Sequence, residues 1–320
     1  MLRVALALAA MMGVITAADA ATVVPTVYEA GHFFATPADT AGHALKLVVD
    51  TGGGGRSWLV YGDAGRAMGL VESSCEGDRT FVTPAFAPGK ALPRSPRNCG
   101  MASNVDWPRS SVENGMLSGW YLSDFIVTFD YPGKRLVFED AGWRSDASAH
   151  TVPLGFLVNR KGKLGSPFPR ITLTIDGQAL DVLLDTGATA HPTVAGQHAM
   201  ATPVVESYGV TSYVTTSVMN RWHEKHPDWK LVDQADDLLG AAKATRAIQV
   251  PAVAVGGWSV GPVWFTERPD KSFVDTMSSY MDGTVFGAAG ANLLQSFRMT
   301  IDYARHKAYL TCIDACRPVR

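Results

Sequence analysis

The feature that most constrains the fold of this chain is a segment that occurs twice. In each copy an apolar run ends in the triplet Asp-Thr-Gly, first at Asp50-Thr51-Gly52 and again at Asp185-Thr186-Gly187. An apolar run of this length, bounded by glycine, is typical of a buried β-strand. Each strand would deliver a carboxylate to a turn at the edge of the core, where an unpaired charge is costly. Two such turns that face each other would bring the two carboxylates together.

A second repeat follows each triplet. The two triplets are 135 positions apart, whereas the two copies of the second motif are 172 positions apart. The later half therefore holds 37 additional residues between its triplet and its copy of the second motif. Two motifs repeated in the same order indicate an internal duplication. A helical insertion at about 205–246 would account for the additional residues, with helices at 217–229 and 233–246 and Asp233 as an N-cap. The pairs in the second repeat are Leu122/Leu294, Phe125/Phe297, Thr128/Thr300, Asp130/Asp302 and Tyr131/Tyr303.

The composition is typical of a globular protein with a large hydrophobic core and many turns. Of the 320 residues 47% are hydrophobic, 31 are Gly and 18 are Pro. The length has room for two domains. We expect an N-terminal lobe at 21–140, a linker at 141–152 and a C-terminal lobe at 153–320. Most elements should be strands, at 23–27, 32–34, 57–61, 169–175, 180–184, 248–255 and 260–265, with hairpins at 125–138 and 299–310.

The N-terminus is typical of a secretory signal peptide. A positive start at Met1-Leu2-Arg3 precedes the apolar run Val4–Ala17, and Ala18-Asp19-Ala20 fits the small-x-small cleavage pattern. A buried N-terminal helix is the alternative. We expect residues 1–20 to be removed and the mature protein, from Ala21, to be periplasmic or secreted. A net charge of −2 provides no basic field for nucleic acid or an anionic membrane, so neither is an expected partner.

Four cysteines agree with an oxidising compartment and allow three disulfide connectivities. We favour the connectivity Cys75–Cys99 and Cys312–Cys316, because each disulfide then lies within one half of the chain. The Cys-x3-Cys spacing of the second pair could also serve a metal or redox site, but no neighbouring His completes a zinc set. We therefore expect no metal and no organic cofactor.

With these features in view, the chain resembles the aspartic peptidases, in particular bacterial retropepsin-like proteins with two fused lobes. The resemblance rests on the two Asp-Thr-Gly triplets and on Trp58-Leu59-Val60 after the first. It also rests on Gly287-Ala288-Ala289-Gly290-Ala291-Asn292-Leu293-Leu294, which is similar to the family's hydrophobic-Gly motif and short helix, with Gly115–Leu122 as its first-lobe counterpart. It implies a mostly β, bilobal acid-protease fold of two tandem retropepsin-like β-barrel lobes, with the helical insertion in the second.

The resemblance also implies an activity and the residues that perform it. Asp50 and Asp185 would share one proton, because two adjacent carboxylates do not both ionise cheaply, and the ionised one would activate a water. Thr51 and Thr186 would bond across the two turns, and Gly52 and Gly187 would let the backbone approach each carboxylate. The implied protein is a monomeric aspartic endopeptidase acting on a peptide or unfolded protein.

Three departures from the family pattern keep an alternative open. Gly53 stands where the family often has Ser, Thr or Ala, and Ser118 stands where the Leu117-Ser118 motif usually has Gly, as in Ala289-Gly290. No aromatic residue of a flap is evident, and Phe81 and Phe86 are the candidates. The alternative is a non-catalytic periplasmic peptide-binding protein on the same fold.

Two further motifs match known sites only in part. Gly257–Gly261 has the Gly-x-Ser-x-Gly pattern of a serine-esterase nucleophile elbow, but that elbow needs a helix after the Ser, whereas 261–265 is typical of a strand. We expect a hairpin turn there. His223 and His226 are three residues apart instead of the four of zinc peptidases, and Pro227 follows, so we expect a solvated helix end.

Overall fold

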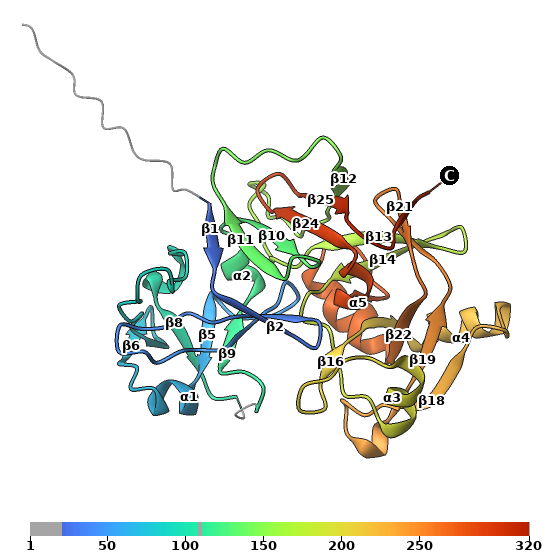
Figure 1. Ribbon diagram of the computed structural model, residues 1–320, viewed down its shortest axis with the longest axis horizontal. Coiled ribbons are helices and arrows are strands. Elements are labelled where there is room, and N and C mark those ends of the chain that lie inside the picture. The colour runs from blue at the N-terminus through green and yellow to red at the C-terminus, as the bar shows by residue number, and fades with distance from the viewer. Residues whose placement is uncertain (1–20, 108–110, 320) are drawn as a thin grey trace, which may run out of the picture.

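The computed structural model describes residues 21–107 and 111–319 and is drawn in Figure 1. The expected signal peptide at 1–20 lies outside the described residues. The protein is mostly β, as the sequence predicts, with sheets of eight, ten, six and two strands. Within the described ranges, no helix is long and apolar enough to cross a membrane.

The first half of the chain folds around the eight-stranded sheet. At its centre β9 (Gly115–Leu117) lies between β4 (Leu47–Val49) and β5 (Trp58–Tyr61), parallel to β4 and antiparallel to β5. Helices α1 (Gly62–Ala67) and α2 (Gly119–Leu122) follow β5 and β9, and a disulfide joins Cys75 to Cys99. In spatial order the strands are β2 (Thr26–Glu29), β3 (His32–Ala35), β4 (Leu47–Val49), β9 (Gly115–Leu117), β5 (Trp58–Tyr61), β8 (Ala102–Val105), β7 (Asp78–Phe81) and β6 (Glu72–Cys75).

The second half repeats this arrangement within the ten-stranded sheet. Here β23 (Gly287–Ala289) lies between β14 (Gln178–Leu184) and β17 (Ser212–Thr215), parallel to β14 and antiparallel to β17. The same three-strand unit therefore surrounds both Asp-Thr-Gly strands, β4 and β14. In spatial order the strands are β18 (Leu231–Asp236), β19 (Thr245–Val250), β22 (Val263–Arg268), β17 (Ser212–Thr215), β23 (Gly287–Ala289), β14 (Gln178–Leu184), β13 (Arg170–Ile175), β20 (Val253–Val255), β21 (Trp258–Val260) and β26 (Arg317–Pro318).

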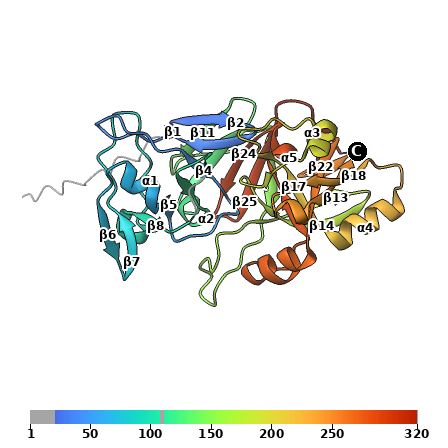
Figure 2. The same ribbon diagram turned by 90° about the horizontal axis from the view of Figure 1, so that it is seen from below.

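A six-stranded sheet joins the two halves (Figure 2). Its central strands, β10 (Ile126–Asp130) and β24 (Phe297–Asp302), pair antiparallel. Thr128 lies opposite Thr300, and the two hydroxyl oxygens are 2.7 Å apart. These two residues are related by the 172-residue repeat, so the duplication in the sequence becomes an approximate two-fold relation in space. In spatial order the strands are β1 (Thr22–Val24), β11 (Arg135–Glu139), β10 (Ile126–Asp130), β24 (Phe297–Asp302), β25 (Lys307–Cys312) and β12 (His150–Pro153).

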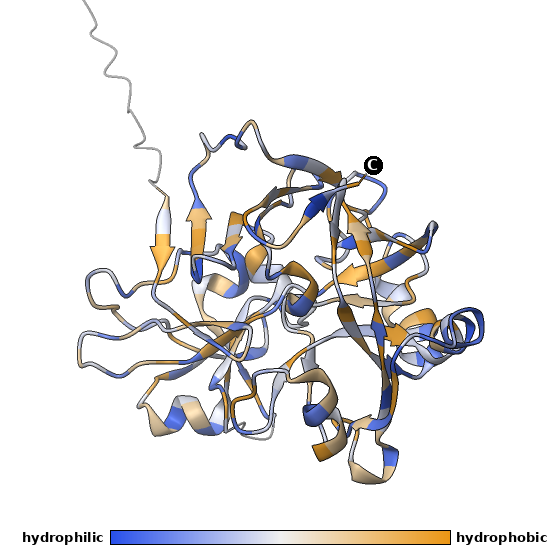
Figure 3. Ribbon diagram, turned by 45° about the vertical axis from the view of Figure 1, so that its right-hand side comes forward, coloured by the Kyte–Doolittle hydropathy of each residue, from blue (hydrophilic) through white to orange (hydrophobic). Residues whose placement is uncertain are grey.

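The expectation of two retropepsin-like β-barrel lobes differs from the strand pairing of the described residues, which gives open sheets. Strands β2 and β6 are the edges of the eight-stranded sheet, and β18 and β26 are those of the ten-stranded sheet. The hairpins β10–β11 and β24–β25, one from each half, pair with each other instead of closing their own halves. One face of these hairpins is buried in the core, with Phe129, Ile301 and Leu310 among its fully buried side chains. Figure 3 shows hydrophobic residues along the strands of the interior, where the sheets meet.

The expected helix at 233–246 is wrong. The segment forms β18, a short 3-10 turn at Ala241–Lys243 and β19, so Asp233 lies within a strand and is not an N-cap. Its apolar side chains suit a sheet, because Ala235 and Ala247 are fully buried and pack with Trp264 of β22. The expected strand at 23–27 is divided, since Pro25 has no amide hydrogen to donate and separates β1 from β2.

Two α-helices lie in or just before the expected insertion at 205–246. The helix expected at 217–229 is present as α4 (Thr216–Lys225) and ends before Pro227, which is incompatible with a continuing helix. Helix α3 (Val194–Met200) was not expected; Thr193 caps it by accepting a hydrogen bond from the Gly196 amide at 3.2 Å. Helix α5 (Ala291–Leu294) follows β23, and the short strands β15 (Thr189–Ala190) and β16 (Gly209–Val210) pair antiparallel.

Candidate active site

The two halves present their Asp-Thr-Gly turns to each other through equivalent contacts. Strand β4 ends one residue before Asp50, and strand β14 ends one residue before Asp185. The amide of Asp50 donates to the carbonyl oxygen of Leu117 at 3.0 Å, and that of Asp185 donates to Ala289 at 3.0 Å. The acceptors are residues of the two hydrophobic-Gly motifs. Each motif therefore fixes the backbone of one aspartate.

Thr51 and Thr186 connect the two turns by four hydrogen bonds. The amide of each donates to the hydroxyl of the other, at 3.1 Å for Thr51 and 3.0 Å for Thr186. Each hydroxyl then donates to a carbonyl of the opposite half, Thr51 to Leu184 at 2.6 Å and Thr186 to Val49 at 2.8 Å. Both threonines are almost completely buried. Because each hydroxyl both accepts and donates, the turns are held in one relative position.

Gly52 and Gly187 place each carboxylate against the opposite turn. Their amides donate to the carboxylate of their own half, at 2.8 Å to Asp50 and 3.0 Å to Asp185. A Cβ atom on Gly52 would lie 2.7 Å from the carboxyl carbon of Asp185, and one on Gly187 would lie 2.3 Å from that of Asp50. No real Cβ tolerates such contacts, so both positions require glycine. The two carboxyl groups thus lie close together at the junction of the halves.

The environment of the pair raises the pKa of both carboxyl groups. Burial raises the pKa of Asp185 well above its ordinary value, and the charge of Asp50 and a hydrogen bond between the two side chains add to this effect. Burial also raises the pKa of Asp50, but hydrogen bonds from Asp185 and from the amides of Gly52, Gly53 and Gly187 oppose it. Two adjacent buried carboxyls do not both ionise cheaply, so the pair is expected to hold one proton jointly near neutral pH.

Asp50 opens into a cleft of about 660 Å³ between the halves. The sequence did not predict which residues line this cleft, because most of them come from strands and loops far from either triplet. From the first half the lining includes His32, Phe34, Tyr61, Trp107, Glu113 and Met116. From the second half it includes Gly187, Thr189, Val205 and Tyr208.

His32 links the first half to the second Asp turn. Its Nε2 lies 3.0 Å from the hydroxyl oxygen of Thr189, which itself donates to the carbonyl of Gly187 at 2.8 Å. The hydroxyl hydrogen is thus already used, so His32 is the donor in its contact. The side chain is buried, and this burial lowers the pKa of His32 to about 4. His32 is therefore neutral over most of the pH range.

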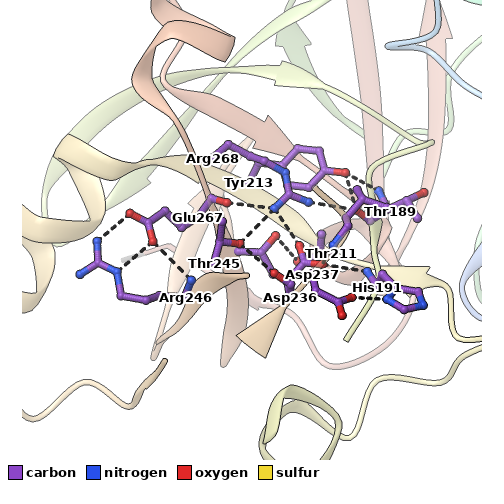
Figure 4. Close-up of polar contacts among 12 residues, drawn as sticks. Thr189, His191, Thr211, Tyr213, Asp236, Asp237, Thr245, Arg246, Glu267 and Arg268 are labelled. Atoms are coloured by element: carbon purple, nitrogen blue, oxygen red, sulfur yellow. Dashed lines mark hydrogen bonds and ion pairs between the residues drawn. The ribbon is translucent and has the colours of Figure 1, made fainter. Parts of the chain in front are cut away.

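A buried ion pair lies close to Thr189, two residues after the second Asp-Thr-Gly turn (Figure 4). The hydroxyl of Tyr213 donates to the carbonyl of Thr189 at 2.5 Å and accepts from its amide at 2.6 Å. The guanidinium of Arg268 lies 4.2 Å from the centre of the Tyr213 ring and 2.7 Å from the carboxylate of Asp236. Asp236 also accepts from the amide of His191 at 2.9 Å, and the His191 ring pairs with Asp237.

The two departures at Gly53 and Ser118 have structural explanations. A Cβ on Gly53 would lie 2.3 Å from the sulfur of Met116 and 2.9 Å from the carboxyl of Asp50, so a larger residue would displace both. Ser118 is buried, and its hydroxyl donates to the carbonyl of Ser57 at 2.6 Å. Neither departure leaves a gap beside Asp50.

Other residues considered from the sequence lie away from the cleft. Phe81 is fully buried in the core of the first half, and Phe86 lines a different pocket. Ser259 lies in β21, the second strand of a hairpin with β20 whose turn is at Gly256-Gly257, so most of the nucleophile-elbow pattern is strand and no helix follows the Ser. His226 bonds to Asp176. In the described part of the chain, no group of three or more His, Cys, Asp or Glu side chains could hold a metal ion.

Comparison with solved structures finds a likeness in fold, whereas comparison with known sequences finds none. No protein-family model matches the chain, and no curated protein matches it. The chain is structurally similar to an aspartic proteinase from Irpex lacteus, with a TM-score of 0.47 and 10% sequence identity. The alignment covers 92% of this chain and 98% of that one.

Proposed function

We propose that this chain is an aspartic endopeptidase built on a two-lobed acid-protease fold, with Asp50 and Asp185 as the catalytic pair. The observation that carries the proposal is the reciprocal hydrogen bonding of Thr51 and Thr186, which holds the two carboxyl groups together under one proton. A purely structural role would not require two acids to be held side by side, because burying an unpaired charge is costly.

The geometry supports a direct attack by water. Ionised Asp50 accepts a proton from a water molecule, and the water oxygen forms a bond to the carbonyl carbon of the peptide. Protonated Asp185 donates its proton to the carbonyl oxygen, which gives a neutral tetrahedral intermediate. That intermediate breaks its C–N bond as the proton on Asp50 passes to the leaving nitrogen and Asp185 recovers its proton from the hydroxyl. The products are a carboxylic acid and an amine, and the pair returns to its starting state.

The hydrogen bonds around the turns support the same proposal through preorganisation. Positioning catalytic groups before the substrate binds removes an entropic part of the barrier. Here the carboxylates are fixed by backbone amides, by the threonine bonds and by the opposing glycines. Because both acids come from one chain, we propose that the enzyme acts as a monomer.

Our proposal for the compartment rests on the disulfides and on the sequence of the N-terminus. The structure contains both Cys75–Cys99 and Cys312–Cys316, and structural disulfides persist in oxidising surroundings. We propose that the protein is exported as a signal-peptide precursor and works in the periplasm or outside the cell on peptides or unfolded proteins.

The test is hydrolysis of an unfolded protein, such as reduced and alkylated casein, followed from acidic to neutral pH with and without pepstatin. We expect cleavage within the chain of the substrate and its loss with pepstatin, whose statine hydroxyl would occupy the position of the attacking water. Binding of peptides without any cleavage at any pH would instead identify a non-catalytic peptide-binding protein. Cleavage that pepstatin leaves unaffected would contradict the assignment of the aspartate pair.

A further inference from the structure

The chain that follows the Asp-Thr-Gly triplet is much longer in the second half than in the first. Strand β5 begins six positions after the first triplet, whereas β17 begins 25 positions after the second. The additional segment, 188–211, contains β15, α3 and β16, and we call it the second-half insert. It supplies Thr189, Val205 and Tyr208 to the lining of the cleft. The position of the insert therefore decides where one wall of the cleft lies.

The hydroxyl of Tyr213 holds the start of this insert by both backbone groups of one residue. It accepts from the amide of Thr189 at 2.6 Å and donates to the carbonyl of Thr189 at 2.5 Å. Burial raises the pKa of Tyr213 despite the nearby guanidinium, and the charge of Asp185 adds to the rise, so the phenol keeps its proton in acidic and neutral solution. The hydroxyl of Thr189 donates to Gly187 and accepts from His32. Thr189 thus connects the Asp turn, the first half and Tyr213.

Arg268 fixes both the ring of Tyr213 and the same carbonyl group. Its guanidinium lies 4.2 Å from the centre of the ring and donates to the carbonyl oxygen of Thr189 at 3.3 Å (Figure 4). Arg268 also pairs with Asp236 at 2.7 Å, and Asp236 accepts from the amide of His191 in the insert at 2.9 Å. Side chains of β17, β18 and β22 therefore meet at the first residues of the insert.

The first half shows that the fold itself does not require this polar pair. By the strand registers, Leu59 of β5 occupies the place of Tyr213, and Val105 of β8 occupies that of Arg268. Leu59 is fully buried, and Val105 packs against the same core. The same strand arrangement thus forms with two apolar residues at these places. The tyrosine and the arginine occur in the half that has the insert, which indicates that they serve the insert.

We propose that Tyr213 and Arg268 are positioning residues for substrate binding, which hold the second-half insert in place as a wall of the cleft. The turn of Asp185 does not depend on them, because the threonine exchange, the amide of Gly187 and the hydrophobic-Gly motif fix it. The pair therefore acts on how tightly the peptide binds and not on the proton transfers. This inference rests on the proposed peptidase function and assigns to it two residues that are not among those lining the cleft.

The first test is Tyr213→Phe, which removes the hydroxyl and keeps the ring. For a quenched fluorescent peptide, KM should rise about tenfold and kcat should stay within about twofold, as when uniform binding is lost. A merely structural role predicts the opposite pattern, because a loss of folded protein lowers the apparent kcat and leaves KM unchanged. Tyr280→Phe, the same change at a side chain that is 53% exposed and outside the cleft lining, should keep both constants of the parent. An unchanged KM in Tyr213→Phe would overturn the proposal.

A second variant tests the arginine. Arg268→Lys keeps a positive charge for Asp236 and removes the planar contact with the ring of Tyr213 and the fork that reaches Thr189. KM should rise in this variant too, while kcat is retained. A KM equal to that of the parent would remove Arg268 from the assignment.

Amide hydrogen exchange provides a measurement that does not need activity. In Tyr213→Phe the amide of Thr189 loses its acceptor, so peptides from 188–211 should exchange at least about tenfold faster than in the parent. Peptides from 178–186 should exchange as before. Faster exchange over the whole chain would show a general loss of stability and reject the positioning role. If the parent cuts no peptide, the proposed function fails by itself; the exchange then still decides the inference, since an unchanged rate in the insert would reject it.

Discussion

Thr51 and Thr186 each accept, at the side-chain hydroxyl, a hydrogen bond from the backbone amide of the other. The two residues are 135 positions apart in the sequence and occupy equivalent places in the two halves. Through this exchange the rigidity of one Asp turn depends on the presence of the other. The Asp50–Asp185 pair and the junction between the halves are therefore one structure, and changes at one should be measurable at the other.

Removing one of these hydroxyls should weaken both stability and activity. In Thr51→Val the amide of Thr186 and the carbonyl of Leu184 lose their partner in a buried setting, which costs about 1–3 kcal/mol for each unsatisfied group. The free energy of unfolding, from urea titration, and kcat should both fall. Thr51→Ser keeps the hydroxyl and should lose much less. Equal losses in the two variants would contradict this explanation, because Thr51→Ser keeps the hydroxyl that makes both bonds.

The raised pKa values of the pair predict a cost in stability that depends on pH. Below the ordinary value of 3.8 the aspartates are protonated in both folded and unfolded chains, and no difference arises. As pH rises, the unfolded chain loses its protons while the folded pair retains one, so the folded state loses stability. Asp185→Asn removes this penalty and should be more stable than the parent at pH 7. The gain should shrink towards pH 3 in urea titrations at the two pH values; a gain independent of pH would contradict this explanation.

His32 should act on stability in the opposite direction. Its folded pKa of about 4 lies below the ordinary 6.5, so the unfolded chain binds a proton before the folded chain does. The stability that neutral His32 provides is present above about pH 6.5 and is lost as pH falls through 4. An NMR titration should find one histidine with a pKa near 4, and its signal should be missing in His32→Gln. If every histidine titrates near 6.5, His32 is not buried as described.

The ion pair behind the second Asp turn should be sensitive to the loss of one partner. The side chain of Arg268 is 6% exposed and that of Asp236 is fully buried. Arg268→Met would leave a buried charge without its partner, which typically costs about 3–5 kcal/mol. The double variant Arg268→Met/Asp236→Leu should recover part of this loss, because it removes the buried charge as well. A single variant as stable as the parent in urea would show that water or another group compensates Asp236.

The sequence predicted those parts of the site that are local or repeated. Asp50 and Asp185 each follow an apolar strand, and the 172-residue repeat anticipated that Thr128 and Thr300 are equivalent. The helix expected at 233–246 failed because the burial of Ala235 and Ala247 against Trp264 is a tertiary effect. The contacts of His32 with Thr189 and of Arg268 with Asp236 were missed for the same reason, since each joins segments that only the fold brings together.

The most direct measurement of the central claim is the rate of peptide hydrolysis by Asp50→Asn, Asp185→Asn and the parent, followed with one quenched fluorescent peptide. Asp63→Asn, at an exposed position on α1, is the control for the same chemical change. We predict that each variant of the pair loses at least about a thousandfold in kcat/KM, since neither half of the mechanism works alone, and that Asp63→Asn cleaves like the parent. If either Asp50→Asn or Asp185→Asn hydrolyses the peptide at the rate of the parent, the catalytic pair proposed for this protein is wrong.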